Sequence, residues 1–292
     1  MLTTGDEVWI EDPGFLPAGH ALALAGGKLI SVPVDNDGID VSAGIALAPS
    51  ARLALVTPAA QFPLGVALSS HRRSQLVSWA ASAKAWVVED DYDSDFNDLE
   101  RPVPTLKHID REGRVLHAGS FSNVLFPGLR LGYLVVPASL VADFERTSAL
   151  LPLQQSLIDQ MVVSDFITLG HFGRHRARMR SLYKERKRAL VDALRNALGD
   201  SIQVADTGGM HVMLHLPANT DDVALANRAR ANGMMINALS PMGLRTRTGP
   251  GLLLGFTNIA VDSAKDAARR LKRTLFTPTL PHIDPVQAYQ VA

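Results

Sequence analysis

The sequence predicts an α/β fold in which a larger part, built on a mainly parallel β-sheet, is followed by a smaller α+β unit. The first observation is a series of short apolar runs in the first half of the chain. Most are near-continuous, as is typical of parallel strands that are covered on both faces. The second is a helical pattern between two of these runs, which makes a βαβ unit. The third is a change after residue 138, where long helical patterns replace the alternation.

Six segments are expected to form the strands of the larger part: residues 7–11, 29–34, 52–57, 85–90, 114–118 and 131–137. Between the third and the fourth lies the segment 69–85, in which Leu76, Val77, Ala80 and Ala83 follow helical spacing. Because a helix of this kind carries the chain back across the sheet, the two strands that it joins are predicted to be parallel.

Helical patterns dominate the segments 139–151, 154–170 and 171–198, and the last of these is long enough to link two domains. A smaller α+β unit follows, with apolar segments near residues 210, 234 and 251 and a final helix from residue 262. The expected organisation is therefore a large domain, linking helices, a small domain and an irregular tail: residues 1–150, 151–200, 201–276 and 277–292.

The composition limits the classes of protein to consider. Of the 292 residues, 47% are hydrophobic and 20% are charged, as in an ordinary globular protein. The 29 basic and 29 acidic residues cancel, so no direct binding of nucleic acid is expected. The chain has no cysteine, which excludes disulfides and thiolate chemistry. With neither a signal-peptide pattern nor an apolar run of membrane length, a cytoplasmic protein without membrane contact is expected.

An acidic segment, VVEDDYDSDF at residues 87–96, ends a predicted buried strand. In open α/β sheets ligands bind at the carboxyl ends of strands, so this position is a candidate site. A calcium loop is excluded, because Phe96 stands where the turn glycine belongs and Pro102 where the bidentate glutamate belongs. Two interpretations remain: a solvated acidic turn, or a carboxylate that holds a protonated ring nitrogen or a cation.

The segment HAGSFSNVLFPGLRLG, residues 117–132, contains the residue types of an anion-binding loop. Ser120 and Ser122 offer hydroxyl groups, and Arg130 offers a guanidinium group that can bind a phosphate through two hydrogen bonds. The alternative is a connection between two strands whose arginine pairs with an acid. The segment alone does not decide between them.

Together with their neighbours, these two segments resemble a known family. The stretches GDEVWIEDPGF, TPAAQFPLG, VVEDDYDSDF, RVLHAGSFSNVLFPGLRLGYLVVP, DFITLGHFGRHRARMRSLYKERKRAL and GLLLGF are similar, in this order, to the aminotransferase-like domain of MocR-type transcriptional regulators of the GntR superfamily. The similarity covers roughly residues 5 to 275. It implies the fold of fold type I pyridoxal 5'-phosphate (PLP) enzymes, with a mainly parallel large domain and a smaller α+β C-terminal domain.

The resemblance assigns roles around the cofactor ring to particular residues. It implies that Phe15 stacks on the pyridine ring, that Asp90 keeps the ring nitrogen protonated, and that Tyr92 forms a hydrogen bond with the ring oxygen. Gln61 lies in a loop that is expected near the same ring oxygen.

The resemblance also implies that Ser120, Ser122 and Arg130 form part of the site that binds the cofactor phosphate. Between them, Asn123 stands where the family has the lysine that forms the Schiff base with PLP. An asparagine amide can neither bond covalently to the cofactor nor shuttle the proton of a transamination. The sequence therefore predicts a site without an intact catalytic residue, in which PLP binds non-covalently at most.

Further departures from the family pattern agree with this prediction. Ala60 stands where MocR-type sequences usually have histidine, and Leu64 where they often have threonine. Leu253 stands where many transaminases have the arginine that grips the substrate carboxylate. A Gly-Ser-Gln helix start, which in the family gives backbone N–H groups to the phosphate, is not found before residue 5.

Two functional interpretations follow from these observations. The first is a catalytically inactive, aminotransferase-like effector or sensor domain related to MocR-type regulators, which takes a small-molecule effector or an amino acid. The second is a PLP-dependent aminotransferase, or an enzyme repurposed for chemistry without the lysine. In either case a homodimer is expected, because fold type I sites are built at a subunit interface.

Two other patterns receive ordinary structural interpretations. In the basic segment 175–190, an inward stripe of Met179, Leu182, Tyr183, Arg186 and Leu190 would leave the other charges on the solvent face of a linking helix. Two pairs of histidines, at residues 171 and 175 and at 211 and 215, are each at most half of a zinc site.

Overall fold

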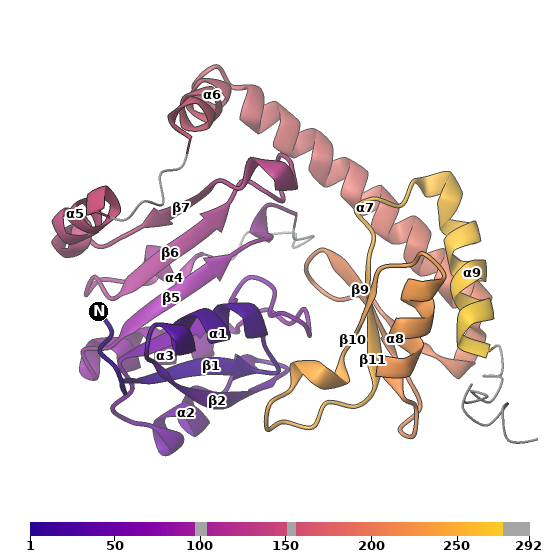
Figure 1. Cartoon of the computed structure of the whole chain (residues 1–292), viewed down its shortest axis with the longest axis horizontal. Helices are drawn as coiled ribbons and strands as arrows, with labels where there is room; N and C mark the ends of the chain where they lie inside the picture. Colours follow the sequence, from indigo (N-terminus) through magenta and orange to yellow (C-terminus); the bar gives the residue numbers. More distant parts are fainter. Residues whose placement is uncertain (97–103, 151–155, 277–292) are drawn as a thin grey trace, which may run out of the picture.

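The computed structural model describes residues 1–96, 104–150 and 156–276, and it contains two β-sheets that are joined by a long helix (Figure 1). The larger sheet has seven strands in the order β3-β2-β1-β4-β5-β6-β7. The pairs that join β2, β1, β4, β5 and β6 are all parallel, whereas β3 and β7 lie antiparallel at the two edges. The predicted mainly parallel sheet is thereby confirmed.

The strands of the larger sheet are β1 (Glu7–Asp12), β2 (Lys28–Asp35), β3 (Gly38–Ile39), β4 (Leu53–Val56), β5 (Trp86–Asp91), β6 (Val115–Ser120) and β7 (Gly132–Val135). Each of the six predicted segments overlaps one of them. The structure adds the two-residue strand β3, which is too short to leave an apolar pattern in the sequence.

Helices cover both faces of this sheet. On one face α1 (Leu16–Leu24) packs through Leu22 against Val8, Ile10 and Leu53. On the other face α2 (Val41–Leu47), α3 (Ser70–Ser82) and α4 (Leu106–Ile109) enclose the main core. At its centre the indole rings of Trp9 and Trp79 stack with their centroids 3.7 Å apart. The predicted helical segment is confirmed as α3.

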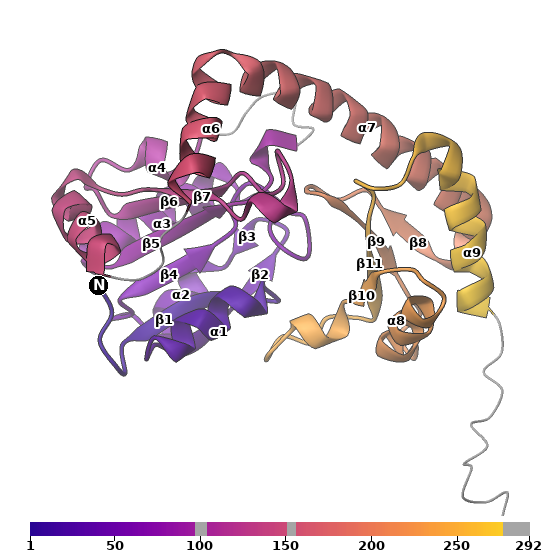
Figure 2. The same ribbon diagram turned by 45° about the horizontal axis from the view of Figure 1, so that its top comes forward.

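Three helices follow the larger sheet: α5 (Val141–Leu150), α6 (Leu157–Thr168) and α7 (His171–Leu198). Figures 1 and 2 show α7 running from the larger sheet to the smaller one, with α5 and α6 beside the β7 edge. The predicted stripe on α7 is confirmed, since Leu190 is buried and its four other members are partly buried. Among the described residues no helix is long and apolar enough to cross a membrane.

The smaller sheet is antiparallel, in the order β10-β11-β9-β8. Its strands are β8 (Gln203–Ala205), β9 (His211–His215), β10 (Ile236–Ala238) and β11 (Gly251–Gly255), and α8 (Asp222–Ala231) and α9 (Ala264–Phe276) pack against it with the second half of α7. Short 3₁₀ turns connect elements throughout the fold: η1 (Ser94–Phe96), η2 (Pro127–Leu129), η3 (Ala138–Leu140), η4 (Gly199–Ser201), η5 (Ser240–Met242) and η6 (Val261–Ser263). The predicted tail lies outside the described residues.

Hydrogen bonds join the larger sheet to the smaller one at the carboxyl end of β1. The buried carboxylate of Asp12 accepts hydrogen bonds from the backbone N–H groups of Leu244, Arg245 and Thr246, at 2.7, 2.8 and 2.9 Å. Nearby, the His211 Nε2 atom lies 2.7 Å from the carbonyl oxygen of Pro63. His211 is thus a buried structural residue, as predicted for this pair of histidines.

Candidate functional site

A cavity of about 260 Å³ lies at the carboxyl ends of the central strands of the larger sheet. It is lined by Phe15, Thr57, Phe62, Asp90, Tyr92 and Asn123. Four of these residues were predicted from the sequence, and they come from three separate segments that follow β1, end β5 and follow β6. This is the place where open α/β sheets bind their ligands.

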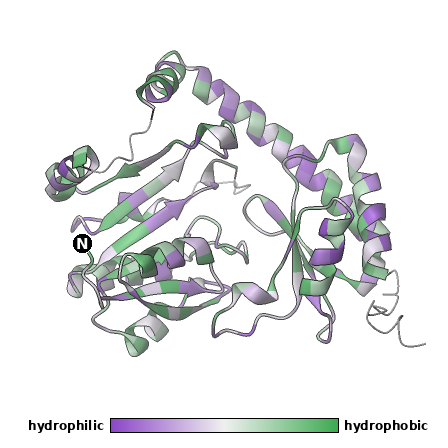
Figure 3. Cartoon of the chain, viewed as in Figure 1, coloured by the Kyte–Doolittle hydropathy of each residue, from purple (hydrophilic) through white to green (hydrophobic). Residues whose placement is uncertain are grey.

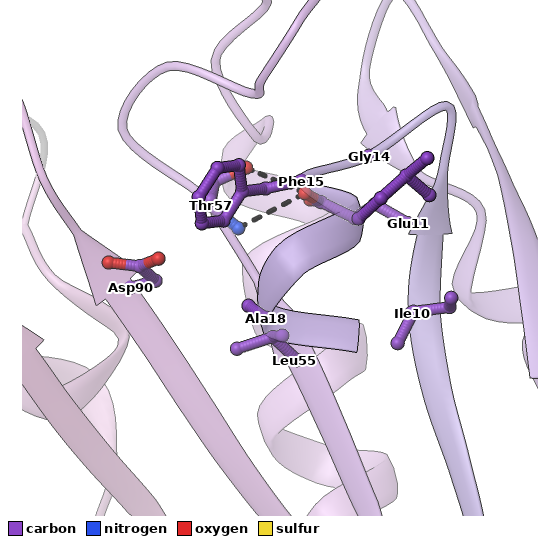
Figure 4. A pocket seen from close by; sticks show the side chains of 9 residues that line it. Ile10, Glu11, Gly14, Phe15, Ala18, Leu55, Thr57 and Asp90 are labelled. Carbon is purple, nitrogen blue, oxygen red and sulfur yellow. Dashed lines mark hydrogen bonds between the residues drawn. The ribbon is translucent and has the colours of Figure 1, made fainter. Parts of the chain in front are cut away.

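Aromatic rings form the walls of this cavity. Phe15, at the start of α1, is 47% exposed and meets Phe62 edge to face, with ring centroids 5.8 Å apart. Phe62 meets the Tyr92 ring edge to face at 6.5 Å. Figure 4 shows an adjoining pocket, which shares Phe15, Thr57 and Asp90 with this cavity, and in it the Phe15 ring and the Asp90 carboxylate stand apart from each other. The shape and polarity of these walls suit a flat aromatic ligand.

Asp90 provides the carboxylate that lines this cavity. Burial raises the pKa of Asp90 to about 6, and the neighbouring Asp91 carboxylate adds to the shift while His117 opposes it. A carboxylate in such surroundings is stabilised by a cationic partner, because a positive charge offsets the loss of water. The protonated nitrogen of a pyridine ring would be a partner of this kind.

Glu11 and Thr57 extend the site and were missed in the sequence. The Glu11 carboxylate accepts hydrogen bonds from the Thr57 hydroxyl at 2.6 Å and the Thr57 backbone N–H at 3.3 Å (Figure 4). Burial raises the pKa of Glu11 to about 7, although these hydrogen bonds oppose the shift. Both residues stand at the carboxyl ends of predicted strands, and this position alone could have identified them as candidate site residues.

The loop that carries Gln61 was expected near the ring oxygen, and it does lie beside Tyr92 and the cavity, through Ala60 and Phe62. The Gln61 side chain itself holds this loop together. The Gln61 amide nitrogen donates to the backbone carbonyls of Pro13 and Phe62, at 2.8 and 2.6 Å, and the amide oxygen accepts from the Leu64 N–H at 3.1 Å. The side chain is 1% exposed and is not among the residues that line the cavity. It holds the loop that carries Phe62.

Tyr92 and Asn123 are connected to each other and to the surrounding loops. The Tyr92 hydroxyl donates to the Ala60 carbonyl oxygen at 3.1 Å, and burial together with the Asp93 carboxylate raises the pKa of Tyr92. The Asn123 amide nitrogen donates to the Tyr92 carbonyl oxygen at 2.9 Å. Asn123 therefore fixes the loop after β6 to the end of β5.

The residues predicted to bind phosphate lie close together in the chain but are not among those that line this cavity. The Ser120 hydroxyl accepts a hydrogen bond from the Ser122 N–H at 3.2 Å, and Ser120 lines a second cavity. Arg130 is exposed, with a left-handed backbone at φ 50°. In the described part of the chain, the residues that suit a pyridine ring are brought together and those for a phosphate are not.

The position at which many transaminases carry a substrate-binding arginine is apolar in the folded chain as well. Leu253 is 4% exposed and belongs to a buried cluster with Met213 and Leu239. Phe62, which lines the cavity, and Leu64 pack against this cluster. Among the described residues that line the cavity there is no lysine or arginine to pair with the Asp90 carboxylate.

Comparison with known proteins supports the fold and the family. The model of the family "Aminotransferase class I and II" matches residues 1–253. The chain is 34% identical over 273 residues to the probable rhizopine catabolism regulatory protein MocR of Rhizobium meliloti, covering 93% of this chain and 55% of that protein. It is 29% identical over 282 residues to the uncharacterized regulator YhdI of Bacillus subtilis, covering 96% of this chain and 59% of that protein. The chain thus spans between half and two thirds of these relatives.

Solved aminotransferases have the same fold. The kynurenine aminotransferase of Pyrococcus horikoshii superposes with a TM-score of 0.83 at 26% identity, over 94% of this chain and 70% of that one. The α-aminoadipate aminotransferase LysN of Thermus thermophilus superposes with a TM-score of 0.84 at 26% identity, over 94% of this chain and 72% of that one. The chain has the fold type I aminotransferase fold. Within the described ranges, no group of three or more His, Cys, Asp or Glu side chains is placed to hold a metal ion.

Proposed function

Because the chain belongs to the aminotransferase class I and II family, we propose that its cavity binds PLP without a covalent bond, and that the chain works as an effector or sensor domain without transaminase activity. The observation that carries this proposal is the convergence of Phe15, Asp90, Tyr92 and Asn123 on one cavity. The first three suit a cofactor ring, and the fourth lacks the amine that catalysis would need.

The fit of the ring rests on three contacts. Asp90 would hold the proton on the ring nitrogen, and Phe15 would lie against the ring face. The Tyr92 hydroxyl would have to turn away from the Ala60 carbonyl to reach the ring oxygen. When bound, such a cofactor supplies a cationic, electron-accepting ring.

Asn123 decides the chemical outcome. Its amide has no proton to give or take near neutral pH and no lone pair for attack on an aldehyde. Its nitrogen is engaged with the Tyr92 carbonyl, so the side chain serves to position the loop. We expect neither a covalent cofactor adduct nor transfer of an amino group.

The effector role is supported by the regulators among the relatives and by the place of the cavity. The Phe62 ring contacts both Tyr92 of the larger sheet and His211 of the smaller one, with centroids 6.5 and 5.6 Å apart. A ligand in the cavity would therefore touch a loop that contacts both sheets. Occupancy would then bias their relative arrangement.

We also propose that two copies of the chain associate through α6 and its surroundings. Figure 3 shows hydrophobic residues on α6, and Ile158, Met161 and Val162 are 72, 59 and 60% exposed. Apolar surface gathered on one helix is costly in water and marks an interaction site. Replacing Met161 by glutamate should shift the sedimentation coefficient from dimer to monomer, and a wild-type chain that is monomeric at all concentrations would refute this.

A second candidate is an aminotransferase, or another enzyme that works without the lysine. It is favoured by the retained ring residues and by the aminotransferases among the relatives, such as the aromatic-amino-acid aminotransferase 1 of Thermococcus litoralis, which is 24% identical. Incubation of the PLP-loaded protein with a panel of amino acids, followed by detection of the corresponding oxo acids, separates the two candidates. Formation of oxo acid above the level of free PLP would favour the enzyme.

The variant Asn123→Lys tests the proposal at the residue that defines it. This variant should form a covalent adduct that absorbs visible light and that borohydride fixes to the protein. The reason is that the amine is restored within the cavity lined by Phe15, Asp90 and Tyr92, which we call the ring cavity. The wild-type chain should bind PLP without such an adduct. An adduct of equal yield in the wild-type chain, at some other lysine, would contradict the proposed non-covalent binding.

A further inference from the structure

A second cavity, of about 290 Å³, lies beside the ring cavity. Its walls include Asp91, Asp93, Phe121, Tyr133, Phe172 and Arg176. Adjacent residues of a strand point to opposite faces, so Asp90 and Asp91 line different cavities, whereas Tyr92 lines both. The function proposed above places no ligand in this second cavity.

The Asp93 carboxylate is the unexplained group at this cavity. Asp93 is 2% exposed, and neither of its carboxylate oxygens accepts a hydrogen bond in the described structure. The nearby Tyr92 hydroxyl gives its proton to the Ala60 carbonyl instead. Burial raises the pKa of Asp93 to about 7; the neighbouring Tyr92 hydroxyl and Lys187 oppose the shift, while Asp91 and Asp90 add to it. A buried carboxylate without a partner is costly to keep, which makes it a candidate for binding a ligand.

The other charged groups nearby have partners of their own. Asp91 accepts hydrogen bonds from the Ser94 hydroxyl at 2.6 Å and the Ser94 N–H at 3.1 Å, and lies 3.8 Å from His117 Nε2. Lys187 Nζ lies 2.6 Å from the Asp206 carboxylate. Arg176 is an exposed residue of α7. Asp93 is therefore the group whose charge a ligand would have to match.

Aromatic rings surround the rest of the cavity. The Phe121 ring meets Tyr133 at a tilt of 49° with centroids 5.4 Å apart, and meets Phe172 edge to face at 5.9 Å. These rings come from the loop after β6, from β7 and from α7, so three elements build the same wall. Aromatic faces attract cations and pack well against apolar groups.

We propose that this second cavity binds a small organic ammonium ion, a primary amine on an apolar or aromatic body, with Asp93 as the partner of the ammonium group. The rings of Phe121, Tyr133 and Phe172 would enclose the body of the ligand. A free amine and an amino acid share this chemistry. They differ in the carboxylate of the amino acid, and Arg176 is the basic side chain in the described lining of the cavity.

The test uses three ligands with the same phenylethyl body: phenethylamine, phenylalanine and 3-phenylpropionate. Isothermal titration of the chain without PLP should show saturable binding of phenethylamine. Binding of phenylalanine as well would identify amino acids as the ligand class, and its absence would identify simple amines. No heat of binding from phenethylamine or phenylalanine up to tens of millimolar, or equal binding of 3-phenylpropionate, would overturn the proposal.

The variant Asp93→Asn assigns the site. It should weaken amine binding by at least about tenfold, because the amide keeps the shape and loses the charge. Asp143→Asn, on the exposed face of α5, is the matched control and should bind as the wild type does. If Asp93→Asn does not fold, Phe172→Ala removes one wall instead, with the same expected loss. Unchanged amine binding in folded Asp93→Asn would refute the site. PLP binding is measured in a separate titration, so that failure of this proposal can be told apart from failure of the proposed function.

Discussion

Glu11 lies at the end of β1 with its carboxyl group fully enclosed, and replacing it by glutamine tests the electrostatics of the ring cavity. Burial raises the pKa of Glu11 to about 7 from its ordinary value of 4.5. Because the folded chain holds this proton more tightly than the unfolded chain, the neutral form favours folding below pH 4.5. That advantage is lost as the pH rises through 7. Glutamine keeps an acceptor oxygen for Thr57 and has no charge to bury.

The size of the effect follows from the two pKa values. For a group that titrates near 4.5 unfolded and near 7 folded, the contribution to the free energy of unfolding falls by about 2 kcal/mol between pH 5.5 and pH 8. Asp90 and Asp93, with pKa values raised to about 6 and about 7, act in the same direction. The wild-type chain should therefore lose stability over this interval, and Glu11→Gln should lose about 2 kcal/mol less.

Urea denaturation at pH 5.5 and pH 8, followed by tryptophan fluorescence, measures both differences. The exposed Glu112→Gln provides the control, and it should reproduce the wild-type loss of stability. If Glu11→Gln loses as much stability between the two pH values as the wild type does, then Glu11 is ionised at both. The account of the buried carboxyl would then be wrong.

Three further substitutions probe the contacts that place the site. Asp12→Ala should lower the free energy of unfolding by about 3 kcal/mol or more in urea denaturation, since three backbone N–H groups lose their acceptor; a loss under 1 kcal/mol would contradict this. Arg73→Lys should lower the free energy of unfolding by about 2 kcal/mol in the same assay, because the buried guanidinium donates to three carbonyls that a lysine cannot reach together. An unchanged free energy of unfolding would refute this. Gly65→Ala should lower the thermal midpoint by several degrees, as φ is 71° and the new Cβ would lie 2.5 Å from Thr207 Cβ; an unchanged midpoint would show that the loop relaxes.

Much of the larger sheet could be predicted from the sequence because its strands are buried. The runs around Trp9, Val56 and Val87 are apolar on both faces, and the helix α3 between two of them requires a parallel crossover. The direction of β7 was not predictable in this way. All four of its residues are exposed, and the loop after β6 is long enough to return on either side.

The residues expected around the cofactor ring could be predicted from their positions at the ends of strands and from the resemblance to the family. Phe15 and Asp90 follow or end parallel strands, so their meeting at one edge is a consequence of the sheet. The role of Gln61 was not predictable, because it depends on which backbone carbonyls the folded loop brings to its amide. The exposed position of Arg130 was not predictable either. Its own backbone is left-handed, with φ at 50°, and no glycine or asparagine at this position indicates that conformation in the sequence.

A fluorescence titration of the purified chain with PLP, run beside Asp90→Asn, tests the central claim most directly. The account predicts saturable binding to the wild-type chain without a visible absorbance band of a covalent adduct. It also predicts affinity at least about tenfold weaker in the variant, since the partner of the ring nitrogen is lost. Equal affinity of the two proteins, or no binding to the wild type at millimolar PLP, would show that this cavity is not a site for the cofactor.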